Sequence, residues 1–156
     1  LYSEKDLEDS LVAHLEQFIL ELGNGFCFVE RQKRMIIDGE DFYLDLLFYH
    51  RKLHRLIAID LKLGRFKAQY KGQMELYLRW LEQNEMEPGE ETPLGLLLCT
   101  EGSEEQIELL QLDKSGIKVA QYMTELPPRD VLIQHIQKSL EVAKAKWGNE
   151  RKEDEV

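Results

Sequence analysis

Two acidic residues interrupt apolar segments in the first half of the chain, and this feature constrains the fold more than any other. Asp45 lies within residues 42–49, which are otherwise aromatic or aliphatic, and Asp60 directly follows the apolar residues 56–59. Both segments are typical of β-strands, and the basic connection at residues 51–55 predicts that they form a hairpin. A buried carboxylate needs a partner or a ligand, so the two acids predict a site at the end of a sheet.

Lys62 belongs to the same predicted site. Side chains alternate along a strand, which places Asp60 and Lys62 on one face. A hairpin register that brings Asp45 beside Asp60 would join two carboxylates and an ammonium group. Adjacent carboxylates repel each other unless a cation lies between them, and their hard oxygen atoms suit Mg²⁺ or Mn²⁺. Lys62 would then orient or deprotonate an attacking water, which is the chemistry of phosphodiester hydrolysis.

Three segments together resemble the YhcG-like family of bacterial nuclease domains, within the PD-(D/E)XK nuclease superfamily: residues 42–50, 60–64 and 72–77. The superfamily signature is an acidic residue on one strand and an (Asp/Glu)-x-Lys triplet on the next, matched here by Asp45 and Asp60-Leu61-Lys62. The resemblance implies a restriction-endonuclease-like core and a metal-dependent endonuclease that acts on nucleic acid, with DNA favoured over RNA. It also implies Mg²⁺ or Mn²⁺ as the cofactor.

The resemblance further implies metal ligands beyond Asp45 and Asp60. The carbonyl group of Leu61 is one expected ligand. A glutamate of the first helix often completes the metal site in this superfamily, and we assign that role to Glu8, which shares the sheet-facing arc of the predicted helix. Two alternatives stay open: that Glu8 only borders the core, and that another glutamate of this helix is the ligand.

A helix predicted over residues 66–84 carries Gln73 among apolar neighbours on the face that packs against the sheet. A buried amide must find hydrogen-bond partners, and Lys62, the carboxylates or a scissile phosphate are the candidates. The resemblance implies the same, because several branches of the superfamily carry an active-site glutamine on this helix. Tyr77, one turn later, either supports Gln73 or belongs to the core. Four residues are expected to contact nucleic acid: Arg65, Lys67, Lys71 and Tyr77.

The predicted fold class is α/β, with the element order αβββαβαβα. Three strands form an antiparallel meander, and a mixed five-stranded sheet is flanked by helices. The first strand is expected over residues 26–32 and the fifth over residues 117–123. We expect one nuclease-like domain over residues 1–147, cut from a longer protein, and a disordered charged tail over residues 148–156.

The charge distribution favours a nucleic-acid contact in one part of the chain. The net charge is −10, but residues 26–72 hold ten Lys and Arg against six Asp and Glu. An acidic remainder repels phosphate, so we expect weak binding by this piece alone, or help from an additional N-terminal domain of the same protein. A homodimer is left open.

Other classes are disfavoured by what the sequence lacks. No apolar segment approaches the roughly 20 residues of a membrane span, and no phosphate-binding glycine loop or Gly-x-Ser-x-Gly motif is present. Cys27 and Cys99 lie in apolar segments without metal-site spacing, so we expect reduced packing residues in a cytoplasmic protein. The alternative function is a catalytically inactive domain that binds nucleic acid or a partner on the same scaffold.

Overall fold

The computed structural model describes residues 4–99 and residues 116, 117, 138, 141, 142, 144 and 145. Its elements follow the predicted order through the first four strands: helix α1 (Glu4–Leu22), strands β1 (Phe26–Ile37), β2 (Glu40–His50) and β3 (Arg55–Lys62), helix α2 (Ala68–Asn84) and strand β4 (Leu94–Cys99). Helix α1 ends at Leu22, and Gly23, with a left-handed backbone (φ 69°), turns the chain toward β1.

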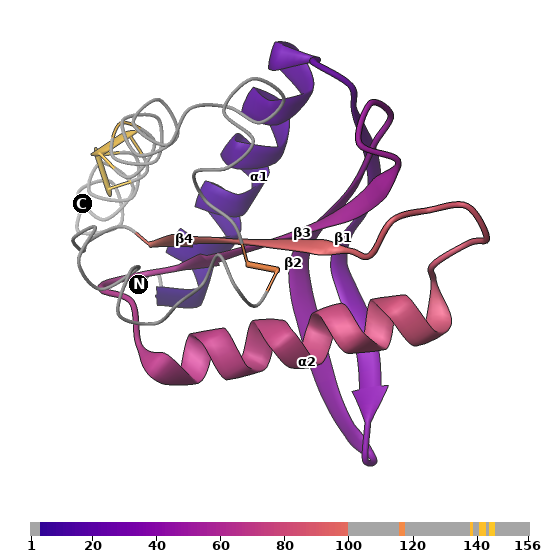
Figure 1. The fold of residues 1–156 in the computed structure, drawn as a ribbon. Coiled ribbons are helices and arrows are strands. Elements are labelled where there is room, and N and C mark those ends of the chain that lie inside the picture. Colours follow the sequence, from indigo (N-terminus) through magenta and orange to yellow (C-terminus); the bar gives the residue numbers. More distant parts are fainter. Residues whose placement is uncertain (1–3, 100–115, 118–137, 139–140, 143, 146–156) are drawn as a thin grey trace.

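The strands form one mixed sheet in the order β1-β2-β3-β4. β1, β2 and β3 pair antiparallel as a meander, whereas β4 pairs parallel to β3. A parallel pair needs a long crossover, and α2 supplies it. Figure 1 shows the sheet nearly edge-on, with α1 on one side and α2 on the other. The predicted mixed sheet flanked by helices is therefore confirmed.

Two apolar layers hold the helices to the sheet, and β3 contributes to both. The layer under α1 joins Leu11, Val12, Leu15 and Ile19 to strand residues that include Leu46, Phe48, Ile57, Ile59 and Leu61. The layer under α2 joins Met74, Tyr77, Leu78 and Leu81 to Met35, Leu44, Leu47 and Ala58. A strand that is covered on both faces reads as a continuous apolar run, which is why the acidic residue at the end of β3 stands out in the sequence.

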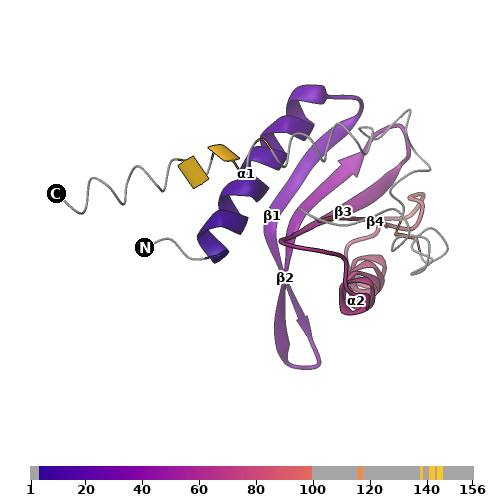
Figure 2. The ribbon, with the colours of Figure 1, turned by 90° about the vertical axis from the view of Figure 1, so that its left-hand side faces the viewer.

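The first strand is longer than predicted, because it ends at Ile37 and not at residue 32. Its charged middle was read as the end of the strand, but apolar alternation resumes at Met35, which is fully buried against the α2 layer. Lys33 is accommodated by an ion pair with Glu85 (Nζ to Oε1, 2.8 Å) just beyond α2. β1 and β2 consequently form a hairpin that projects well past β3 (Figure 2).

The sheet has four strands within the described residues, not the five that were predicted. The expected fifth strand lies almost wholly outside them, although Ile117 forms a parallel bridge with Gly95 of β4. The helix expected between the fourth and fifth strands and the tail at residues 148–156 also lie outside the described residues. Residues 138, 141, 142, 144 and 145 are helical. None of the helices in the described part of the chain is long and apolar enough to cross a membrane.

Candidate active site

The two acidic residues meet where β2 and β3 stop pairing. The strand register runs from His50 opposite Arg55 to Leu46 opposite Ile59, so Asp45 and Asp60 come next. The Asp45 backbone N–H donates to Asp60 Oδ1 at 3.0 Å. Asp45 Oδ2 in turn accepts from the backbone N–H of the residue after Asp60, at 2.8 Å. The sequence-based expectation that these two carboxylates lie side by side is met.

Lys62 and Gln73 complete the cluster from the α2 side of the sheet. The Lys62 ammonium lies 3.3 Å from Asp60 Oδ2 and donates a hydrogen bond to Gln73 Oε1 at 3.0 Å. It also lies 5.2 Å from the ring centre of Tyr70, a position that favours a cation. Of the partners that the sequence offered for the Gln73 amide, the structure selects Lys62.

The cluster is short of positive charge. Asp60 is 2% exposed. Burial raises its pKa from 3.8 to about 7, the Asp45 charge adds to the rise, and Lys62 opposes it. The pKa of Tyr77 is also raised, mainly by burial and then by the charge of Asp60. A buried carboxylate that resists ionisation beside a second carboxylate marks a place where a further cation would be stabilising.

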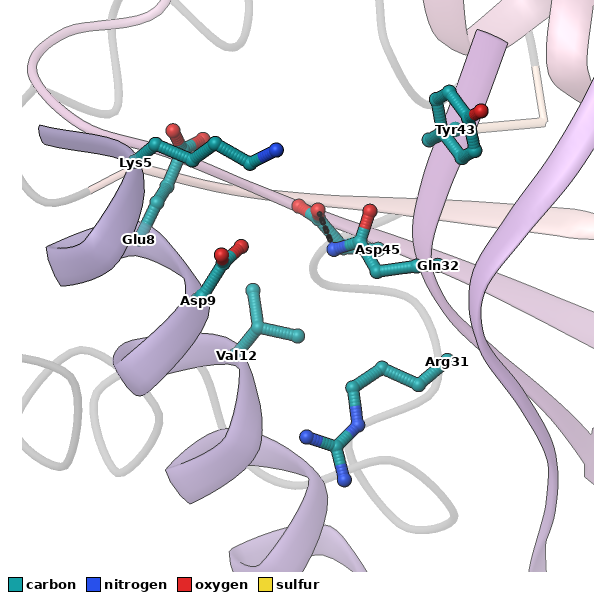
Figure 3. A pocket seen from close by; sticks show the side chains of 8 residues that line it. All are labelled: Lys5, Glu8, Asp9, Val12, Arg31, Gln32, Tyr43 and Asp45. Carbon is teal, nitrogen blue, oxygen red and sulfur yellow. Dashed lines mark hydrogen bonds between the residues drawn. The ribbon is translucent and has the colours of Figure 1, made fainter.

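A cleft of about 870 Å³ opens on the α1 side of Asp45 (Figure 3). Its lining comes from the first turns of α1 and from the β1–β2 hairpin: Lys5, Glu8, Asp9, Val12, Arg31, Gln32, Tyr43 and Asp45. Glu8 therefore faces the same cleft as Asp45, on the opposite wall. Arg31 does not point free into solvent, because its guanidinium binds both carboxylate oxygens of Glu16 on α1, each at 3.2 Å.

The donor atoms fit a hard divalent cation. Asp45 and Asp60 present adjacent carboxylates, and the Leu61 carbonyl belongs to β3, between Asp60 and Lys62. Among the described residues, no group of three or more His, Cys, Asp or Glu side chains could hold a metal. Mg²⁺, however, usually binds through one or two carboxylates together with waters and substrate phosphates, so two carboxylates are a sufficient protein contribution.

The four residues expected to contact nucleic acid differ in their surroundings. Arg65 and Lys67 are exposed between β3 and α2. Lys71 is half-buried, 3.8 Å from the Glu75 carboxylate. Tyr77 is 2% exposed and lies in the α2 layer, so the expected contact of its side chain with nucleic acid is wrong, and it takes the alternative role in the core.

Gln32 is a site residue that sequence reasoning missed. Its side-chain N–H donates to Asp45 Oδ1 at 3.0 Å. No motif points to it, since it stands in a charged stretch beside Arg31. Only the extended hairpin register, which brings this part of β1 across from Asp45, would have revealed it.

A mixed sheet between two helices, with Asp45 and Asp60-Leu61-Lys62 converging where β2 and β3 stop pairing, defines a domain of the PD-(D/E)XK nuclease class. The family described as "YhcG PDDEXK nuclease domain" matches residues 1–141, and the chain belongs to this family. The resemblance found in the sequence, with its restriction-endonuclease-like core, is thereby confirmed.

One curated relative is "Putative nuclease YhcG" of Escherichia coli (strain K12), which is 42% identical over 127 residues. The match takes in 81% of this chain but 34% of that protein, so the chain spans about a third of the length of that relative. Two solved structures are also similar. One is a repair endonuclease from Pyrococcus abyssi, at 22% identity and a TM-score of 0.49, over 67% of this chain and 43% of that chain. The other is an EndoMS–dsDNA2 complex, at 19% identity and a TM-score of 0.48, over 67% and 41%.

Proposed function

We propose that this domain is a metal-dependent endonuclease that hydrolyses phosphodiester bonds in DNA. One observation carries the proposal: a buried Asp60 contacts Asp45 and Lys62 at once, at the point where β2 and β3 stop pairing. Membership of a nuclease family supports the reaction class. A purely structural role explains these residues poorly, because a raised pKa at Asp60 makes the ionised cluster destabilising for the fold.

Asp45, Asp60 and the Leu61 carbonyl are the residues that would hold Mg²⁺ or Mn²⁺. Glu8 lines the opposite wall of the cleft and, among the described residues, does not form a three-carboxylate group with them, so its proposed part is to complete the site from across the cleft. When bound, the ion would supply charge stabilisation and an acidified water. The protein contributes fixed orientation. Both oxygens of Asp45 accept protein hydrogen bonds, one from Gln32 and one from the Leu61 backbone, so its carboxylate plane is set before any ligand arrives.

Lys62 is the proposed catalytic residue for proton movement and water orientation. An ammonium group has three N–H donors. In the described part of the chain Asp60 and Gln73 take two of them, so the third can face a water or a phosphate oxygen. Gln73 holds the ammonium through its amide oxygen, and we assign it a positioning role.

The nucleic-acid backbone is proposed to contact the segment between β3 and α2. Arg65 and Lys67 are exposed there, next in the chain after Lys62. Phosphate contacts supply most of the affinity of such proteins, and this stretch belongs to the basic part of an otherwise acidic chain. Binding by the chain alone is therefore expected to be weak and strongly salt-dependent.

A cleavage panel tests the function. The purified chain is incubated with duplex, branched and single-stranded DNA and with matching RNA, each in Mg²⁺, Mn²⁺, Ca²⁺ or EDTA. We expect cleavage of DNA in Mg²⁺ or Mn²⁺ and none in EDTA. Asp45→Asn and Asp60→Asn, which preserve shape while removing charge, should abolish it. An exposed variant away from the site, Arg79→Ala, is the matched control and should cleave normally.

Metal binding separates this function from the inactive-scaffold alternative. A cation that binds only the folded state raises the melting temperature by mass action. We expect Mn²⁺ to raise the melting temperature of the wild type, and the Asp45→Asn/Asp60→Asn variant to show no rise. Calorimetry without any heat of binding at millimolar metal, with and without DNA, would instead favour a domain that only binds nucleic acid or a partner.

A further inference from the structure

The backbone of β1 contains an unusual residue directly across from the site. Gln32 has φ 53°, in the left-handed region. Among the described residues, four non-glycine residues have positive φ, and the other three, Asn24, Asp38 and His54, lie in turns. A glutamine in this conformation inside a strand is disfavoured and persists only where its surroundings enforce it.

At this position the side chains of the β1–β2 hairpin change from one face of the sheet to the other. Leu44 packs in the α2 layer and Leu46 in the α1 layer, although residues two apart on a regular strand share a face. β1 behaves in the same way, because Arg31 lines the α1 cleft while Lys33 reaches Glu85 beyond α2. The strand register pairs Arg31 with Leu46 and Lys33 with Leu44 without a shift, and in the described strands Gln32 has no ladder partner between them. The reversal therefore coincides with the left-handed backbone of Gln32, whereas the register shift of β1 lies earlier, between Phe28 and Glu30.

The reversal is what aims Asp45 at the cleft. Asp45 lies between the two leucines that face opposite ways, and its carboxylate opens toward α1 (Figure 3). The side chain of Gln32 reaches across from β1 to β2, and its N–H group donates to Asp45 Oδ1 at 3.0 Å. The left-handed backbone and the amide contact occur at one residue, so the strained backbone coincides with the group that holds the carboxylate.

We propose that Gln32 is a positioning residue for Asp45, and that the left-handed backbone at Gln32 is retained because it places this amide on the carboxylate. The inference rests on the proposed function, in which Asp45 is a metal ligand. Hydrogen bonds to metal-ligating carboxylates orient them and support metal affinity. Replacement of Gln32 by glycine should therefore stabilise the fold while it lowers the metal affinity of the site. The same replacement at an ordinary strand residue would instead destabilise the fold.

Two substitutions separate the backbone from the amide. Gln32→Gly removes both the strain and the amide, whereas Gln32→Met keeps a side chain of similar length without an amide. In EDTA, Gln32→Gly should raise the melting temperature by roughly 2–5 °C, and Gln32→Met should not. Both should weaken Mn²⁺ binding, measured by calorimetry without substrate, by about 10–100-fold.

The matched control is His54→Gly. His54 is exposed, lies in the turn between β2 and β3 and has the same φ, 53°. This variant should also raise the melting temperature, but should leave Mn²⁺ affinity within about twofold of wild type. A Gln32→Gly protein that melts lower than wild type, or that binds Mn²⁺ with unchanged affinity, would overturn the proposal.

A measurement without metal distinguishes failure of the proposed function from failure of the positioning role of Gln32. If the wild type bound no divalent cation, the proposed function would fail, and a double-mutant cycle in EDTA would still decide the coupling. Gln32→Met should lower the melting temperature of the wild type more than that of an Asp45→Ala background. Equal losses in both backgrounds would show that the two side chains are independent and would overturn the positioning role.

Discussion

The Lys62 ammonium donates to the amide oxygen of Gln73 at 3.0 Å, which ties the end of β3 to α2. A neutral amide is an informative partner. Lys62 already forms an ion pair with Asp60 at 3.3 Å, and the amide adds a neutral partner that fixes the position of the ammonium group. The contact therefore positions the ammonium group without adding a second negative charge beside it.

Lys62→Met should lose about 10²–10⁴-fold in single-turnover cleavage, the usual contribution of a general base or water-orienting group. Methionine keeps the length and the apolar stem but has no charge. Cleavage is measured at saturating Mn²⁺, alongside DNA affinity in Ca²⁺. Removal of the ammonium leaves two carboxylates that repel each other, so Mn²⁺ affinity should rise while the metal-free melting temperature falls. Cleavage within a few-fold of wild type would remove Lys62 from the catalytic residues.

Gln73→Glu should impair cleavage without loss of stability. The new carboxylate would lie about where the amide oxygen now accepts from Lys62, and would give the ammonium group a second ion pair beside the one with Asp60. We expect a loss of at least about tenfold in cleavage with an unchanged or higher melting temperature. Gln73→Ala should also lose activity, because Lys62 loses the hydrogen bond that fixes its position. Normal turnover in Gln73→Ala together with a clear drop in melting temperature would show that Gln73 is structural.

The metal-free protein should lose stability as the pH rises from about 4 to about 7. The pKa of Asp60 is higher in the folded chain, about 7, than its ordinary value of 3.8, because of burial and the Asp45 charge. The folded state therefore binds the proton more tightly, and this stabilisation is complete below the ordinary pKa and is lost as the pH passes the folded one. Its upper limit is roughly 4 kcal/mol. In EDTA, Asp60→Asn should show a smaller fall in melting temperature from pH 5 to pH 8 than the wild type, and saturating Mg²⁺ should also reduce the fall. Equal pH profiles for the two proteins would contradict this assignment.

Gly95→Ala should destabilise the fold by overpacking. A Cβ atom at Gly95 would lie 2.6 Å from Met74 Cγ and 2.8 Å from its sulfur, and such overlaps cost roughly 1–3 kcal/mol. Gly72→Ala is the control, because nothing lies within 4 Å of a Cβ atom there, and alanine is the better helix former. Thermal melts should show a fall for the first and a rise for the second. A Gly95→Ala/Met74→Ala protein should lose less than the sum of the two single changes.

The sequence predicted the parts of this molecule that depend on local pattern. Apolar runs, a hairpin connection and helical spacing were enough for the order of elements, for the meeting of Asp45 with Asp60, and for the inward face of Gln73. Gln32 was missed because its role depends on a reversal of strand faces, which follows from how two layers pack and not from residue alternation. The length of β1 was missed for a related reason. Charges in its middle are tolerated because Lys33 finds Glu85, a partner more than fifty residues later in the chain.

β3 packs under both helices, and this has a consequence for how such a domain can diversify. Asp60 and Lys62 are carried by a central strand whose movement would disturb both layers. The first turns of α1 and the middle of the β1–β2 hairpin, at Arg31 and Tyr43, line the cleft beside Asp45. New substrate preferences are therefore expected to arise, by evolution or by engineering, through changes at exposed positions of the hairpin and the helix start, while Asp60 and Lys62 stay fixed on β3.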